Sequence, residues 1–214
     1  QISERCQEKN LTEFKYFYIF WKFVRLKKKN RERKRNFMNT SLENIYKDHQ
    51  VKPYISPDRD IEAWLLNPKP VPKRNMELLE DNLLAGDIIL LWRINFGTFT
   101  TETWFPKYFE YTYGIDAPKH LDKLVEKGYA TIETAFDSLD HLNATMKKNI
   151  LKKKGVTGLS KMKASDLNQA LHDHFSEEEL SHCFSIRGFK LTPKGEQALK
   201  DHQAIFDRHP KKNL

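Results

Sequence analysis

Residues 113–132 carry the clearest pattern of apolar and polar positions in the chain. Asp116 and Pro118 suit the start of a helix, because a carboxylate accepts the unpaired N–H groups there and proline lacks one. The apolar positions that follow recur at helical spacing: Leu121, Leu124 and Val125. Gly128 then predicts a helix end, since glycine adopts the left-handed conformation at low cost. In residues 129–132 the side chains alternate in polarity, which predicts a strand.

A matching pattern returns near the end of the chain. Residues 189–199 predict a strand that runs into a helix capped by Thr192 and opened by Pro193. The two segments, Leu-x-x-Leu-x-x-x-Gly-Tyr and Leu-Thr-x-x-Gly-x-x-x-Leu, resemble the second half of a winged helix-turn-helix domain. The resemblance implies that residues 129–132 pair with residues 189–192 as a hairpin. In that family the hairpin turn is short, whereas here residues 133–188 separate the strands.

The remaining pattern is mostly helical. Residues 39–53 and 56–66 predict two helices, the second capped near Ser56, and alternate prolines predict an extended connector over residues 67–74. Residues 76–92 predict a helix that breaks near Gly86 and is capped again by Asp87. Residues 105–111 predict a short helix that completes a helix-turn-helix with the helix after Asp116.

The long insertion has its own helical pattern. One amphipathic helix is predicted from Leu139 to Ile150, a second around Leu167–Phe175, and a third that starts at a Ser176–Glu179 capping box. The run Leu-x-x-Leu, then Met-x-x-x-Ile-Leu-Lys-x-x-Gly-Val, then Ser-Lys-x-Lys-Ala-x-Asp-Leu resembles the SAP domain, a small helix-loop-helix DNA-binding module. Lys161 departs from this pattern, because it stands where the SAP family usually has glycine. The combination is similar to SAP-containing proteins of Gram-positive bacteria and their prophages.

The expected fold is therefore mainly α with a small β-hairpin. A winged-helix-like scaffold, split over residues 76–135 and 187–208, carries a SAP-like helix-loop-helix insertion at residues 136–186. Residues 38–75 precede it as helices and a proline-rich connector.

The excess of positive charge is concentrated in the first 37 residues of the chain. The chain has a net charge of +8, from 37 Lys/Arg and 29 Asp/Glu. Residues 1–37 hold 12 of the basic residues and 4 of the acidic ones, so residues 38–214 hold 25 of each. A polyanion-binding function must therefore rest on a local patch.

Residues 1–37 are a basic, aromatic extension unlike the rest of the chain. The apolar part is too short and too often interrupted by lysine to span a membrane, which takes about 20 apolar residues. One interpretation is a helix at a membrane surface. We favour the hypothesis that residues 27–36 are a translated ribosome-binding tract, so that the native protein starts at Met38 and the preceding segment is non-native or disordered.

A lysine cluster in the insertion is the strongest candidate site. Residues 146–165 contain seven lysines and no acidic residue. We predict that this cluster binds double-stranded DNA through phosphate contacts rather than base readout, because it has no arginine and no stacking aromatic. The predicted contact residues are Lys147, Lys148, Lys152, Lys153, Lys154, Gly155, Ser160, Lys161 and Lys163. The alternative is a solvated lysine face.

The helix after Asp116 is the second candidate. It offers Lys119, His120, Lys123 and Lys127, offset by three acidic residues, and no side chain suited to bidentate base readout. Its competing interpretation is a structural or dimerising element. Residues Trp104–Tyr113 are aromatic and form a candidate protein-binding surface.

Enzymatic and metal functions find little support in the sequence. His172, His174, His182 and Cys183 lack the spacing of a four-ligand metal site, and two cysteines build no disulfide framework. Because no motif of a catalytic site or phosphate-binding loop is present, we expect no cofactor and no enzyme activity. The predicted function is that of a cytoplasmic, non-enzymatic DNA-binding protein of phage or mobile-element type. The alternatives are a protein-interaction module and an unrecognised nuclease or defence subunit.

Overall fold

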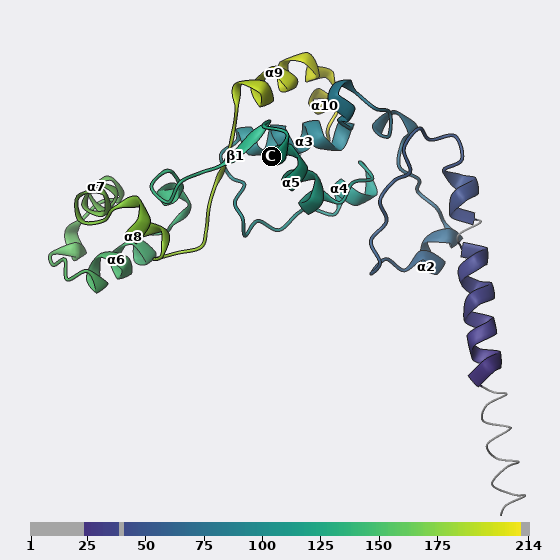
Figure 1. Ribbon diagram of the computed structural model, residues 1–214, viewed down its shortest axis with the longest axis horizontal. Coiled ribbons are helices and arrows are strands. Elements are labelled where there is room, and N and C mark those ends of the chain that lie inside the picture. The colour runs from purple at the N-terminus through teal and green to yellow at the C-terminus, as the bar shows by residue number, and fades with distance from the viewer. Residues whose placement is uncertain (1–23, 39–40, 211–214) are drawn as a thin grey trace, which may run out of the picture. The chain divides into compact units, whose positions relative to one another are not determined.

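The structure is a computed structural model that describes residues 24–38 and 41–210 (Figure 1). Most of its regular structure is helical, and its one sheet has two strands. The predicted mainly helical fold with a small β-hairpin is therefore confirmed. Within the described ranges, no helix combines the length and the apolar character that crossing a membrane requires.

The chain divides into two compact units. The smaller unit contains the described residues up to Asp48 together with Asp58–Pro70, and the larger one contains His49–Pro57 and the described residues from Val71 onward. Residues 49–57 and 71–75 thus belong with the larger unit, whereas the sequence grouped them with the N-terminal helices.

The smaller unit has three helical segments: residues 24–38, residues 41–45 and α2 (Ile61–Leu66). The buried ring of Tyr46 stacks on Trp64 with 6.3 Å between centroids. The predicted helix at 56–66 begins later than expected, because the Asp60 carboxylate, not Ser56, accepts the Ala63 N–H. Residues 1–23 of the predicted extension lie outside the described residues.

The larger unit is built around α3 (Ala85–Asn95), whose residues Ile88 to Leu91 are completely buried. Helices α5 (Ala117–Glu126), α9 (Pro193–Asp201) and α10 (Gln203–Asp207) pack against it. The prediction of helix from residue 76 was wrong. Residues 73–84 contain only two 3-10 turns, η1 (Lys73–Asn75) and η2 (Glu80–Asn82), and Asp81 and Asn82 have positive φ angles. The predicted break near Gly86 is absent from α3, in which Asp87 is the third residue and caps the helix by accepting the Leu84 N–H at 2.7 Å.

The predicted turn, helix and strand after α4 (Tyr108–Tyr111) are confirmed by α5 and β1 (Ala130–Ile132). Pro118 lies in the first turn, and Gly128 takes a left-handed φ of 72°. The predicted capping by the Asp116 side chain was wrong. Its carboxylate accepts no backbone N–H and instead forms an ion pair with Lys119, with 2.9 Å between oxygen and nitrogen.

The predicted strand pairing is confirmed. Strand β1 pairs antiparallel with β2 (Phe189–Leu191) in the register Ala130↔Leu191 to Ile132↔Phe189. On its other edge, the returning chain bonds to residues 99–101: the Phe189 N–H donates to the Phe99 carbonyl, and an isolated bridge joins Thr100 to Gly188. Thr192 then caps α9 by accepting the Gly195 N–H, as predicted.

Between β1 and β2 the chain forms a separate helical group, here called the inserted module (residues 135–186). In Figure 1 the chain leaves β1, builds this group and returns to β2. Its elements are η3 (Asp137–His141), α6 (Ala144–Lys153), η4 (Leu159–Lys161), α7 (Ala164–His174) and α8 (Glu177–Ser181). The predicted helix from Leu139 to Ile150 is split, because Asn143 interrupts it and caps α6 by accepting the Met146 N–H. The capping box at Ser176 is confirmed.

The inserted module has its own core. The buried residues of this core are Ala135, Leu139, Leu142, Ile150, Leu151, Leu167, Ala170, Leu171 and Leu180. Where the module joins the sheet, the Gly188 N–H donates to the Ser138 hydroxyl at 3.0 Å, and Lys190 forms an ion pair with Asp137. The two ends of the module therefore meet at the sheet.

Candidate nucleic-acid interface

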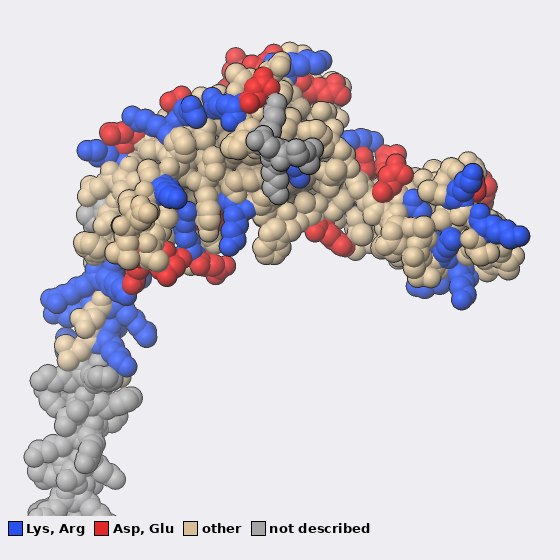
Figure 2. Space-filling view, turned by 180° about the vertical axis from the view of Figure 1, so that it is seen from behind, with Lys and Arg blue, Asp and Glu red and all other residues tan. Residues whose placement is uncertain are grey.

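The core of the inserted module decides which of its lysines reach solvent. Ile150 and Leu151 of α6 and Leu167 and Leu171 of α7 are buried against one another, so the two helices lie side by side. Lysines on the remaining faces of α6 and in the loop before α7 point outward. Figure 2 shows Lys and Arg side chains gathered on the module's surface.

Lys147 is not part of this surface, and its predicted role in binding was wrong. The residue is only 4% exposed, and its Nζ donates to Oδ1 of Asn168 at 2.7 Å. Its position has a simple cause, because Lys147, Ile150 and Leu151 share the i, i+3, i+4 spacing of one helix face. That spacing is visible in the sequence and would have excluded Lys147 from the candidate surface.

Lys154 is exposed but already engaged. Its Nζ lies 2.6 Å from a carboxylate oxygen of Glu179 and 4.9 Å from the ring centroid of Phe175. The hydrogen bond from Lys154 holds the pKa of the Glu179 carboxyl below its usual value. The ammonium group therefore has a local counter-ion, which reduces what it contributes to binding a phosphate.

Five lysines of the predicted set remain accessible. Lys148 is half-buried, and its Nζ makes a long bond of 3.5 Å to the Ser160 carbonyl, which ties α6 to the loop before α7. The other four are exposed, and in the described part of the chain no hydrogen bond or ion pair engages their ammonium groups: Lys152, Lys153, Lys161 and Lys163. We call these five residues the lysine face. Gly155 and Ser160 are exposed beside them.

The N-terminus of α7 is less available to an anion than its position suggests. The Lys163 N–H donates to the Asp166 carboxylate at 2.9 Å, and the Ser165 hydroxyl also donates to Asp166. A carboxylate at this helix end satisfies part of the positive end of the helix dipole. The lysine face therefore depends on ammonium groups rather than on backbone donors.

The competing surface on α5 is largely neutralised from within. Lys119 is paired with Asp116, and His120 Nδ1 lies 2.6 Å from an oxygen of the fully buried Asp87. Lys127 donates to the Asp81 carbonyl at 2.6 Å. Lys123 is half-buried, and no hydrogen bond or ion pair among the described residues involves its ammonium group. Three of the four predicted side chains, Lys119, His120 and Lys127, thus already have a partner within the chain.

The aromatic stretch Trp104–Tyr113 is mostly core. Phe109 and Tyr113 are buried, and the hydroxyl of Tyr113 lies 2.7 Å from Nδ1 of His209. Burial raises the pKa of Tyr113 to about 12. Trp104 and Tyr111 are the exceptions, with 84% and 41% of their surface exposed. The predicted protein-binding surface therefore shrinks to these two side chains, of which Trp104 is the more exposed.

Metal binding gains no support from the geometry. Among residues 24–38 and 41–210, no three His, Cys, Asp or Glu side chains are arranged to hold a metal ion. His172, one of the histidines noted in the sequence, stacks on Phe136 with 4.1 Å between ring centroids.

Comparisons of the chain with protein-family models, with curated proteins and with solved structures find no match.

Proposed function

We propose that this chain is a non-enzymatic DNA-binding protein in which a winged-helix-like body presents a SAP-like module. The order of elements supports the body: α3, the short extended segment 99–101, α4, α5, β1 and β2 follow one another as in that family, and residues 99–101 bond to the chain that returns to β2. The inserted module stands in the place of the hairpin turn. A phage or mobile-element setting is part of the same proposal.

The observation that carries the proposal is the contrast between two basic surfaces. Four lysines of the inserted module have no partner in the described chain, whereas most cations of α5 are used internally. Free ammonium groups gain affinity for DNA by displacing condensed counter-ions, and paired ones gain less. We therefore place DNA contact on the lysine face and not on α5.

The chemistry of the lysine face determines the mode of binding. Lysine is a point charge that fits a phosphate oxygen, and it lacks the planar fork with which arginine reads guanine. Binding should depend on the phosphate backbone and on groove shape, with little preference for sequence.

Fluorescence anisotropy titrations with a double-stranded DNA of about two helical turns, at several salt concentrations, test this proposal. If three or four phosphates are contacted, log K should fall by about 3 per log unit of salt, which is about 60-fold between 50 and 200 mM. Changing Lys152, Lys153, Lys161 and Lys163 to Gln should abolish most of the affinity and most of the salt slope.

A matched pair of double variants separates the two surfaces. Lys161→Gln with Lys163→Gln removes two charges from the module, and Lys119→Gln with Lys123→Gln removes two from α5. We expect the first pair to weaken binding by about tenfold or more and the second to change it little. The assignment to the module is wrong if the α5 pair is the one that fails. DNA binding itself is refuted if the unaltered chain does not bind at about 50 mM salt.

Protein binding is the second candidate, and Trp104 favours it. The turn that carries this residue is held by the bond from the Thr100 N–H to the Thr103 hydroxyl and by the bond from the Thr101 N–H to the Arg187 carbonyl. An exposed tryptophan on a held turn loses little conformational entropy on binding and is typical of interface hot spots. This candidate takes first place if the titrations show no DNA binding.

A further inference from the structure

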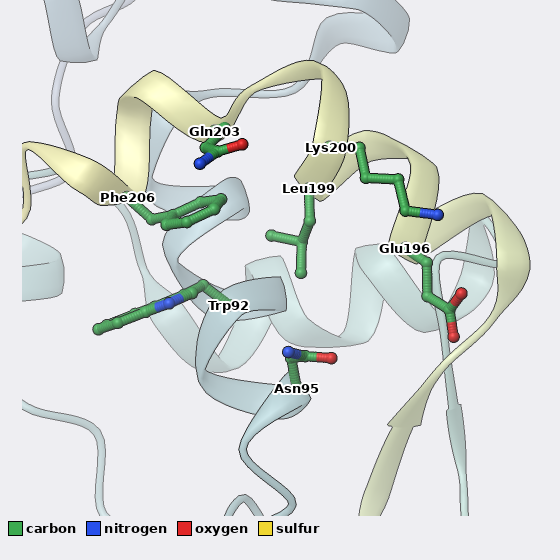
Figure 3. Close-up of a pocket in the computed structure, with 7 residues that line it drawn as sticks. All are labelled: Trp92, Asn95, Glu196, Leu199, Lys200, Gln203 and Phe206. Carbon is green, nitrogen blue, oxygen red and sulfur yellow. The ribbon is translucent and has the colours of Figure 1, made fainter.

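A groove between α3 and the C-terminal helices forms an apolar surface that the proposed DNA binding does not use. It has a volume of about 380 Å³ and contains Trp92 from α3, Leu199 from α9 and Phe206 from α10 (Figure 3). The ring of Phe206 stacks on Trp92 with 6.2 Å between centroids and 11° between planes. Phe96, directly after the end of α3, makes an edge-to-face ring contact with Trp92 and is 54% exposed. Apolar surface therefore continues out of the groove into solvent.

The rim of this groove carries one acid and one base. Glu196 and Lys200 lie one turn apart on α9, and in Figure 3 both side chains lie on the same side of Leu199. Both are exposed, and within the part of the chain that the structure describes no hydrogen bond or ion pair engages either side chain. Asn95 and Gln203 line the remainder.

We propose that a second copy of this chain docks on this groove and forms a two-fold symmetric dimer. In such an interface each patch meets itself, so every charged group must find its opposite on the same patch. Two α9 helices that cross antiparallel bring Glu196 of one chain next to Lys200 of the partner subunit, and the reverse contact follows by symmetry. The apolar surfaces around Trp92 and Phe96 are covered in the same step.

The proposal accounts for three features at once. A large exposed phenylalanine beside a half-buried tryptophan is costly in water and marks a binding surface when it continues a groove. Glu196 and Lys200, which have no partner among the described residues, complement each other across a two-fold axis. A partner surface that carries only one sign of charge would leave one of the two facing a like charge. Burying two tryptophans and four phenylalanines gives the central aromatic contact that such interfaces need. This inference stands independently of DNA binding, although a dimer would also hold two lysine faces on one DNA.

Charge exchange tests the dimer directly. Glu196→Lys leaves two bases on each rim and Lys200→Glu leaves two acids, so each variant alone repels its own copy. Sedimentation equilibrium should show a concentration-dependent dimer for the unaltered chain and a dimer at least about tenfold weaker for each variant, since like charges then face each other. An equimolar mixture of the two variants should regain the dimer, because acids then face bases.

Two further variants complete the experiment. Glu178→Lys makes the same charge change as Glu196→Lys on the inserted module and should leave the dimer unchanged. Phe96→Ser removes exposed apolar surface and should weaken the dimer without unfolding the chain, which circular dichroism checks.

Several outcomes would overturn the proposal. An unaltered chain that remains monomeric up to about 1 mM has no specific dimer. If the dimer survives both Glu196→Lys and Lys200→Glu, it forms through another surface. If an equimolar mixture of the two variants stays monomeric, Glu196 of one chain does not face Lys200 of the other. The monomeric variants should still bind DNA with the salt slope of the lysine face, so failure of DNA binding and failure of dimerisation are told apart.

Discussion

Removing the inserted module tests whether the larger unit contains two cores or one. The change replaces residues 135–186 by a short glycine-containing turn between Thr134 and Arg187. The ends to be joined lie side by side, because the Glu133 N–H donates to the Gly188 carbonyl at 2.9 Å. The buried residues of the module's core all fall between Ala135 and Leu180, so the excision removes that core as a whole.

The expected cost follows from the contacts that cross the junction. The Gly188 N–H loses the Ser138 hydroxyl but gains water, which costs about 1 kcal/mol. The ion pair between Lys190 and Asp137, 2.8 Å long and half-exposed, contributes at most about 1 kcal/mol. Shortening the connection removes closure entropy and offsets a few tenths of this loss. The excision also removes the carbonyls of Ser181, Phe184 and Ile186, which accept from the Arg187 guanidinium, and the contact of His141 with Glu133. Because each such bond contributes about 0.5–1.5 kcal/mol, the remaining protein should unfold about 2–5 kcal/mol more easily in total.

Thermal unfolding followed by circular dichroism measures this effect. For a protein of this size the melting temperature should fall by about 4–20 °C, and the transition should stay cooperative. Loss of a cooperative transition would show that the module and the helices around α3 share one core, and would refute the description of the module as an insertion. A control that changes only Asp137→Asn should lower the melting temperature by less than the excision does.

Two further predictions concern packing and pH. A Cβ atom at Gly195 would lie 2.1 Å from the Tyr129 carbonyl oxygen, which belongs to the backbone and cannot move aside. Gly195→Ala should therefore destabilise the protein by about 1–3 kcal/mol in urea titrations, although alanine favours helices. Gln197→Ala on the same helix is the control and should cost less than about 0.5 kcal/mol, and equal stability of the two variants would disprove the close approach. The pKa values of Glu179 and Asp137 are held below their usual values by hydrogen bonds from Lys154 and Lys190, so their stabilising contribution is present above about pH 4 and is lost as the pH falls through the lowered values. Glu179→Gln should therefore reduce the difference between urea midpoints at pH 7 and pH 3, and an unchanged difference would show that the pair with Lys154 does not persist in solution.

Local structure in this protein was accessible from sequence wherever a short motif sets the backbone. Gly128 ends α5, Thr192 caps α9 and Ser176 opens α8, because each depends on the residue's own conformational preference or on a hydrogen bond three residues away. The pairing of β1 with β2 was predictable for a different reason. The two segments on either side of the insertion resemble the second half of a winged helix-turn-helix domain, and it was this resemblance that implied the hairpin.

Tertiary structure decided which polar side chains are available for function. The spacing in the sequence places Lys147 on the apolar face of α6, but only the packed structure supplies Asn168 as the partner of its ammonium group. His120 and Lys127 were assigned to a surface, but their partners, Asp87 and Asp81, lie more than thirty residues away in the chain. The groove between Trp92 and Phe206 had no local signal at all, since its halves come from opposite ends of the larger unit. Apolar periodicity shows that a residue faces a core, but only the packed chain shows which distant side chains complete a site.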